Sequence, residues 1–144
     1  MREIKFRGID CSGQWVYGDL IHKRHDKGAI LIQDAKGIGS DVDITTIGQY
    51  TGLKDKNGKE IYEGDILRCN GYPYNYDGVD NYFAEIVWAD NICSFYKITR
   101  KNPKSIVNGI SHGNWSELDE EDIESFEVIG NIHDNPELIK EEEK

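Results

Sequence analysis

The chain has 144 residues, of which 17 are Lys or Arg and 27 are Asp or Glu, so its formal net charge at pH 7 is −10. This length is typical of one domain, and the apolar content of 38% is enough for a single core. No run of about 18 apolar residues is present to span a bilayer, and residues 1–10 alternate charged with apolar positions, unlike a secretory signal. We expect a soluble cytoplasmic protein that does not contact a membrane.

The negative charge is concentrated at the C-terminal end. Residues 1–116 hold 15 basic and 15 acidic groups, whereas residues 117–144 hold 2 and 12. Such an end repels phosphate backbones, which disfavours non-specific binding of nucleic acid. The alternative is that these charges form only a solvated helix face and a frayed terminus.

Cysteines and histidines give no sign of a metal or cofactor site. The three cysteines are widely spaced and include no C-x-x-C pair, which indicates reduced thiols. Cys69 and Cys93 lie in apolar segments typical of strands, which predicts that both are buried. His22 and His25 have no companion ligands at metal-binding spacing. We therefore predict no metal and no cofactor.

Short segments of period-two alternation, separated by Gly, Asn and Asp, predict antiparallel strands. In the first segment, Ile4 and Phe6 share one face while Lys5 and Arg7 share the other. Gly18, inside the second, predicts a bulge or a close backbone approach. The expected strands are residues 3–7, 14–22, 29–33, 47–52, 66–69, 82–88, 93–99 and 126–132.

The connections between these strands are marked by turn and helix signals. The Gly-rich residues 37–40 predict a mobile loop. Asn57 and Gly58 are expected to take the two positive-φ positions of a type I′ hairpin turn. Ser116, followed by acidic residues, predicts the cap of a short helix. Asn135 and Pro136 predict the start of a second short helix.

Three parts of the sequence together resemble the YopX family of phage and prophage proteins. The resemblance rests on residues 4–7 with 15–18, on residues 47–65, and on residues 127–132 with 135–138. It implies a phage-derived protein of a bacterial host cell with a mainly β (β-rich α+β) fold of short antiparallel strands. It further implies one domain over residues 1–144, with N-terminal strands and a hairpin in 1–60 and an SH3-like small barrel with a short C-terminal helix in 61–144. No catalytic residue is implied.

One motif suggests catalysis. Residues 109–113 match the G-x-S-x-G nucleophile elbow around Ser111, and Asp122 and His133 follow in the Ser, Asp, His order. The elbow, however, depends on a strand-to-helix turn above a large parallel sheet, and the βα alternation of such a sheet is missing. A small hydrolase using Ser111 is the disfavoured alternative, and we predict no enzyme.

Two polar or aromatic clusters suggest recognition instead. Alternating tyrosines in a Gly-rich loop can stack bases or anchor a protein, and an uncompensated basic cluster follows them. These candidates for partner binding are Tyr72, Tyr74, Tyr76, Lys97, Arg100, Lys101 and Lys104. A third candidate surface surrounds the central hairpin: Gln49, Tyr50, Thr51, Lys54, Asp55 and Lys56. We predict a non-enzymatic binding or adaptor module for a protein or for single-stranded nucleic acid, while pairing of open sheet edges would give homo-oligomers.

Overall fold

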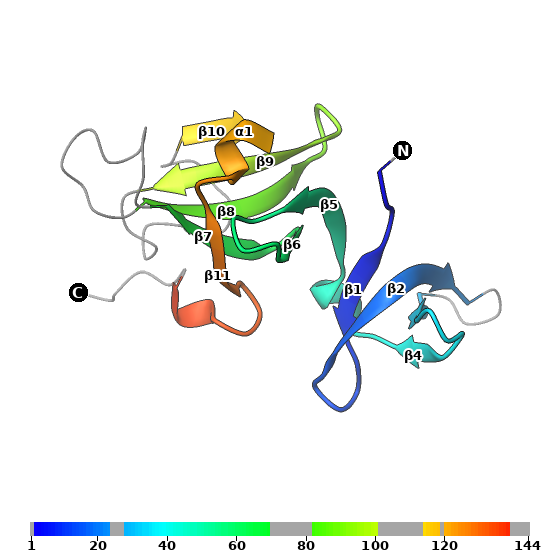
Figure 1. Cartoon of the computed structure of the whole chain (residues 1–144). Helices are drawn as coiled ribbons and strands as arrows, with labels where there is room; N and C mark the ends of the chain where they lie inside the picture. The colour runs from blue at the N-terminus through cyan, green and yellow to red at the C-terminus, as the bar shows by residue number, and fades with distance from the viewer. Residues whose placement is uncertain (1, 24–27, 70–81, 101–113, 119, 139–144) are drawn as a thin grey trace. The chain divides into compact units, whose positions relative to one another are not determined.

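The structure is a computed structural model that describes residues 2–23, 28–69, 82–100, 114–118 and 120–138 (Figure 1). Within these ranges the chain is mainly β, with antiparallel strands and only short helical turns, which confirms the mainly β, antiparallel part of the predicted fold class. The chain divides into two compact units, Met1–Gly52 (unit 1) and Leu53–Lys144 (unit 2). No helix among the described residues is long and apolar enough to cross a membrane.

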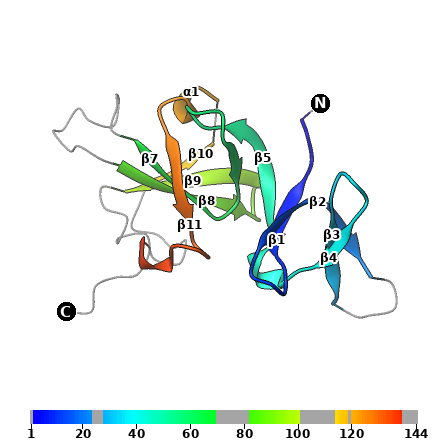
Figure 2. The ribbon, with the colours of Figure 1, turned by 60° about the horizontal axis from the view of Figure 1, so that its bottom comes forward.

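Unit 1 is a twisted antiparallel sheet (Figure 2). Its strands follow the order β4-β3-β2-β1-β5, and the predicted β1–β2 hairpin is confirmed by the register that pairs Phe6 with Gly18 and Ile9 with Trp15. The strand β5 begins in unit 1, where Gly48 pairs with Arg7, and its last two residues belong to unit 2. The elements are β1 (Phe6–Ile9), β2 (Trp15–His22), β3 (Ile30–Gln33), β4 (Gly39–Asp41), the 3-10 turn η1 (Ile44–Thr46) and β5 (Gly48–Lys54).

Residue polarity does not predict burial on β1. Arg7 is 5% exposed, whereas Ile4, just before the strand, is 56% exposed. The guanidinium of Arg7 lies over the ring of Trp15, with 4.5 Å between its central carbon and the ring centroid. This cation–π contact gives the buried charge an aromatic partner.

Gly18 marks a close approach of two backbones, as predicted. A Cβ at this position would stand 1.9 Å from the carbonyl oxygen of Gln33, so a side chain would separate β2 from β3. The prediction of a mobile loop at residues 37–40 was wrong. Asp34 accepts backbone hydrogen bonds from Lys36 and Ile38, each at 2.9 Å, and this ordered turn leads directly into β4.

Unit 2 contains the larger core. Its main sheet has the order β10-β9-β8-β7-β11. The elements are β6 (Glu60–Tyr62), β7 (Asp65–Cys69), β8 (Tyr82–Ala89), β9 (Ser94–Arg100), β10 (Asn114–Glu117), α1 (Glu120–Ile123), β11 (Glu127–Asn131) and the 3-10 turn η3 (Pro136–Leu138). The fully buried cluster comprises Ile61, Leu67, Cys69, Ala84, Ile86, Ile123 and Phe126. In the described part of the chain no ladder joins β10 to β11, so the sheet is open and an SH3-like closure is not seen.

Both predicted helix starts differ from the structure. Ser116 does not cap a helix, because it lies in β10 opposite Lys97, and α1 begins only at Glu120. Backbone pairing with β9 therefore prevails over the capping tendency of Ser116. At the C-terminal signal, Pro136 opens a single 3-10 turn, and the residues beyond 138 lie outside the described ranges.

The central turn and one cysteine were also predicted wrongly. Asn57 has no positive φ, and only Gly58 does, at 80°, so the turn is not type I′. Asp55 accepts the N–H of Asn57 at 2.8 Å, which favours a type I turn followed by a left-handed glycine. Cys69 is buried as predicted, but Cys93 is exposed, because it occupies the left-handed position (φ 51°) of the β8–β9 turn.

Candidate functional site

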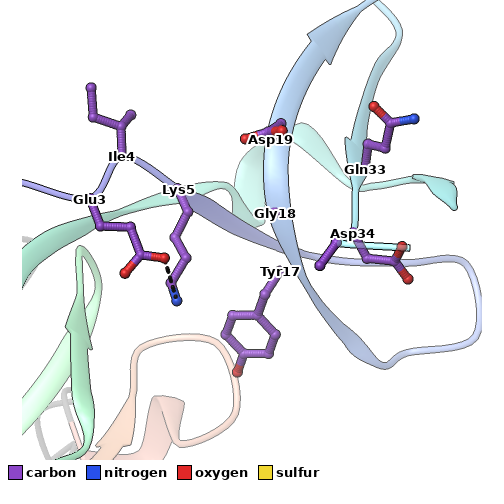
Figure 3. A pocket seen from close by; sticks show the side chains of 9 residues that line it. Glu3, Ile4, Lys5, Tyr17, Gly18, Asp19, Gln33 and Asp34 are labelled. Carbon is purple, nitrogen blue, oxygen red and sulfur yellow. Dashed lines mark ion pairs between the residues drawn. The ribbon is translucent and has the colours of Figure 1, made fainter. Parts of the chain in front are cut away.

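A hollow of about 380 Å³ opens around Gly18 on unit 1. Residues from three segments line it: the extended chain before β1, the middle of β2, and the end of β3 with the turn that follows. Figure 3 shows Tyr17 and Lys5 on one side of β2 and Gln33 and Asp34 on the other. The lining residues are Glu3, Ile4, Lys5, Tyr17, Gly18, Asp19, Gln33, Asp34 and Ala35. Gly18 and Gln33, whose backbones approach closely, both line it.

The lining of this first hollow is polar, with an excess of negative charge. Lys5 pairs with Glu3 at 3.4 Å, and its ammonium also stands 5.3 Å from the ring centroid of Tyr50. The single lysine is thus matched by one carboxylate. Asp19 and Asp34 add two further carboxylates to the lining. A cationic group is the ligand that this charge favours.

A second hollow of about 280 Å³ adjoins the first, because Tyr17 and Asp34 line both. Its remaining walls are mostly apolar and come from β2, β3, the turn before β4 and β4 itself: Trp15, Val16, Ile32, Ile38 and Ser40. We call the residues lining the two hollows the twin-hollow surface. It combines an apolar compartment with an acidic one.

Three large apolar side chains of the twin-hollow surface are exposed to solvent. The exposed fraction is 56% for Ile4, 46% for Tyr17 and 60% for Ile38. Scattered single apolar residues are normal on a protein surface, but apolar groups gathered beside a concavity are typical of a binding site. Tyr17 and Ile38 line the same second hollow, and this shared concavity, rather than the exposure of any one residue, makes the surface the candidate site.

The position of Ile38 is set by its turn. Asp34 donates its N–H to the carbonyl of Ile38 and accepts the N–H of Ile38 on its carboxylate, each at 2.9 Å. Gly37 takes φ 83°, which a residue with a side chain adopts at a cost. Ile38 is therefore held at the rim of the second hollow by a rigid turn.

The residues predicted from the sequence as contacts are mostly not described. Tyr72, Tyr74, Tyr76, Lys101 and Lys104 lie outside the described residues, as does Ser111. The backbones of Lys97 and Arg100 lie in β9, opposite Ile86 and Phe83, and their side chains are not described. The predictions on these residues stay predictions.

Of the remaining predicted groups, some are placed where they cannot form an exposed surface. Tyr50, Thr51 and Asp55 are each less than 9% exposed, which is against the surface predicted around the central hairpin.

His133 uses its backbone N–H to bind the side-chain oxygen of Asn131 at 2.9 Å. Within the described ranges, no group of three or more His, Cys, Asp or Glu side chains is arranged to hold a metal ion.

Sequence reasoning missed the twin-hollow surface because Tyr17 and Ile4 look like ordinary strand residues. One signal was available. Ile38 stands between Gly37 and Gly39, and a lone large apolar residue in a Gly-rich segment has no strand face on which to be buried. Such a residue indicates an exposed apolar contact.

Comparison with known proteins agrees with the resemblance noted in the sequence. No curated protein sequence matches this chain. The crystal structure of protein EF1440 from Enterococcus faecalis is similar to it with a TM-score of 0.54 and 29% sequence identity, covering 97% of this chain and 100% of that one. The sequence model of the YopX protein family matches residues 5–140. The chain therefore belongs to the YopX family.

Proposed function

We propose that this protein is a non-enzymatic binding or adaptor module that recognises a protein partner through the twin-hollow surface. The observation that carries the proposal is the exposure of Ile4, Tyr17 and Ile38 beside two adjoining concavities. Aromatic and aliphatic anchors that enter or border a pocket supply most of the free energy at protein interfaces. Phage origin, a location in the bacterial cytoplasm and an SH3-like barrel in residues 61–144 stay part of this proposal, on the family resemblance.

Charge favours a protein over a nucleic acid at this surface. Asp19 and Asp34 line the first hollow, and Lys5 there already has Glu3 as its partner. A phosphate backbone would meet these carboxylates and a chain of net charge −10. The predicted contacts of Tyr72, Tyr74 and Tyr76 and of the basic cluster remain a second proposed surface, for which a single-stranded nucleic acid is the alternative partner.

The test begins with affinity capture from the bacterial host, identification of the bound protein and purification of that partner. Its dissociation constant is then measured against the wild-type chain and two variants, Tyr17→Ala and Ile38→Asp. We expect each variant to weaken binding by tenfold or more, because each removes or charges an apolar anchor.

Ile44→Asp is the matched control. Ile44 is 57% exposed, nearly the same as Ile38, and belongs to the same unit, but it lines neither hollow. This control should bind as tightly as the wild type. Equal losses for Ile38→Asp and Ile44→Asp, or no loss for either, would reject the twin-hollow surface as the contact.

A further inference from the structure

The carboxylate of Asp34 is held beside both hollows by its own turn. Asp34 is half-buried, and its Oδ1 accepts the backbone N–H groups of Lys36 and Ile38, each at 2.9 Å. These two bonds orient the carboxylate before any ligand arrives, and a group that is already oriented loses less entropy on binding. Asp34 is therefore a preorganised negative charge in the lining of the twin-hollow surface.

The negative charge of the first hollow is not compensated by a described cation. Asp19 is exposed on β2 and lines this hollow together with Asp34. Among the described residues, no ion pair involves either of these aspartates, and Lys5 pairs with Glu3. Lys36 is exposed in the turn after Asp34 but lines neither hollow. A basic side chain in the first hollow would thus meet two carboxylates.

Tyr17 lies where the two hollows meet. It lines both, and 46% of its surface is exposed. The face of an aromatic ring attracts a cation, while the ring also offers apolar contact. The second hollow is walled mainly by Trp15, Ile32 and Ile38, which favours an apolar side chain. A ligand that lies against Tyr17 can therefore direct a basic group to one side and an apolar group to the other.

The end of β4, next to the second hollow, is already paired on its outer side. Asp10 forms a bridge with Val42, just after β4, and the N–H of Asp43 donates to the carbonyl of Ile9 at 2.9 Å. The end of β4 thus meets the end of β1. We therefore expect a ligand of this surface to be recognised by its side chains rather than by backbone pairing along β4.

On these observations, and resting on the proposed function, we propose that the twin-hollow surface binds a segment of the partner protein in which an apolar residue lies close to a lysine or arginine. The apolar side chain enters the second hollow, and the basic one lies against Tyr17 and the carboxylates of Asp19 and Asp34. Touching spheres of the two volumes would have their centres about 9 Å apart, which an extended chain covers in roughly three residues.

The first experiment selects ligands for the full chain from a displayed library of random dodecapeptides, with an empty support as the background. We expect enriched peptides to combine an apolar residue with Lys or Arg about two to four positions away. Enrichment of peptides without a basic residue, or no enrichment over the background, would overturn the proposal.

The second experiment compares two aspartates of the same kind of turn in unit 1. Asp34→Asn and Asp10→Asn each remove one negative charge, and each keeps the side-chain oxygen that accepts the backbone N–H groups of its turn. Only Asp34 lines the hollows. Since both variants change the net charge equally, a non-specific attraction for basic peptides would respond equally to both.

We expect the best selected peptide to bind Asp34→Asn about tenfold more weakly than the wild type, and to bind Asp10→Asn as tightly as the wild type. Equal affinities of the two variants would overturn the proposal.

A change in the peptide tests the same contact on the wild-type chain. Its arginine is replaced by citrulline, or its lysine by acetyl-lysine, which removes the charge of the side chain. The neutral peptide should bind the wild type about tenfold more weakly, and this loss should shrink to about twofold or less on the double variant Asp19→Asn/Asp34→Asn. The same loss on both proteins would show that the charge is bound elsewhere and would overturn the proposal.

Failure of this proposal is distinguishable from failure of the proposed function. If Tyr17→Ala and Ile38→Asp weaken binding of the partner protein but Asp19→Asn and Asp34→Asn do not, the surface is a contact that does not select a basic residue. The proposed function then stands and the present proposal fails. If none of the four substitutions weakens binding, both fail.

A second copy of this chain is the competing occupant of the hollows. Sedimentation at several concentrations distinguishes it. Self-association that Asp34→Asn abolishes and Asp10→Asn preserves would show that a segment of another copy fills the hollows, and would overturn the proposal. Any other result leaves the hollows open to a foreign segment and agrees with the proposal.

Discussion

Three turns of sequence Asp-x-x-Gly occur in this chain, two in unit 1 at residues 10–14 and 34–38, and one in unit 2 at residues 55–59. All three have the same hydrogen bonds. The aspartate N–H donates to the carbonyl four residues on at 2.8–2.9 Å, the glycine N–H donates to the aspartate carbonyl at 3.0 Å, and one carboxylate oxygen accepts two backbone N–H groups at 2.8–3.0 Å. The glycine φ is 80–84° in each.

The turns differ in what the second carboxylate oxygen does. In unit 2, Oδ2 of Asp55 accepts the backbone N–H of Val128 in β11 at 2.9 Å, and Lys56 N–H donates to the carbonyl of Phe126 at 3.0 Å. Asp55 is accordingly buried, at 6% exposed, whereas Asp10 and Asp34 are half-buried. The motif therefore closes a hairpin in unit 1. In unit 2 its aspartate also binds the edge strand β11, at a residue 73 positions further along the chain.

The largest expected effect follows from this difference. Asp55→Ala leaves three backbone N–H groups without their acceptor, including that of Val128, and we expect it to lower the free energy of unfolding by about 3 kcal/mol. Asp34→Ala leaves only two N–H groups in an exposed turn, and we expect about 1 kcal/mol. Urea titration followed by circular dichroism measures both values.

Asp55→Asn sharpens the comparison, because it keeps one acceptor oxygen and places an amide N–H₂ where the other oxygen was. We expect an intermediate loss of about 2 kcal/mol. If Asp55→Ala and Asp34→Ala proved equally costly, the bond to β11 would contribute nothing measurable, and the contrast between the two units would be false.

Two glycines compare a close approach of two strands in unit 1 with a turn in unit 2. Gly18→Ala would bring a Cβ to 1.9 Å from the carbonyl oxygen of Gln33, and backbone cannot move aside as a flexible side chain can. Gly58→Ala meets open space and is strained only by its φ of 80°. We expect losses of about 3 kcal/mol for Gly18→Ala and about 1 kcal/mol for Gly58→Ala.

Thermal unfolding of the two glycine variants under identical conditions gives the ranking. A larger fall in Tm for Gly58→Ala than for Gly18→Ala would mean that β2 and β3 adjust freely around Gln33. That result would also mean that the lining of the first hollow at Gly18 and Gln33 can change shape.

Much of the fold could be predicted from the sequence, because period-two alternation and turn residues act locally. The β1–β2 and β8–β9 hairpins were found in this way, as was the close approach at Gly18. The errors arose where a side chain redirects the backbone. Asp34 and Asp55 each accept hydrogen bonds from the backbone N–H groups two and four residues further along the chain. At Asp34 these bonds form an ordered turn and strand where a mobile loop was predicted. At Asp55 they form a turn that is not the predicted type I′.

The candidate site was less accessible to sequence reasoning. Whether a strand residue is buried depends on which other elements pack against its face, and the sequence of the strand alone does not determine this. Arg7 is buried over Trp15, while Tyr17, two residues after Trp15, is exposed. The same reasoning explains the error at Cys93, whose apolar neighbours suggested a strand interior although it takes a turn position. Only Ile38, isolated between glycines, was a local sign of the twin-hollow surface.

The smallest expected effect concerns two carboxyl groups, one in each unit, whose pKa values are both lowered. The Ser12 hydroxyl, which donates to Asp10 at 2.6 Å, is the main cause for Asp10, followed by the N–H of Gln14. For Glu127 the main cause is its hydrogen bond from Arg68, whose Nε donates at 3.0 Å. A lowered pKa in the folded state means that the ionised group stabilises the fold above its unfolded pKa, and that this stabilisation is lost as the pH falls through the folded pKa.

Salt should separate the two groups. Asp10 is held by neutral donors, whose dipoles are little affected by ionic strength, whereas Glu127 is held by a guanidinium whose attraction salt screens. In carboxyl-carbon NMR titrations, we expect 0.5 M NaCl to raise the pKa of Glu127 toward its ordinary value and to leave that of Asp10 nearly unchanged. Ser12→Ala should raise the pKa of Asp10 and not that of Glu127. Equal responses of the two groups to salt would mean that charge, and not the hydrogen bonds within the turn at residues 10–14, stabilises the ionised Asp10.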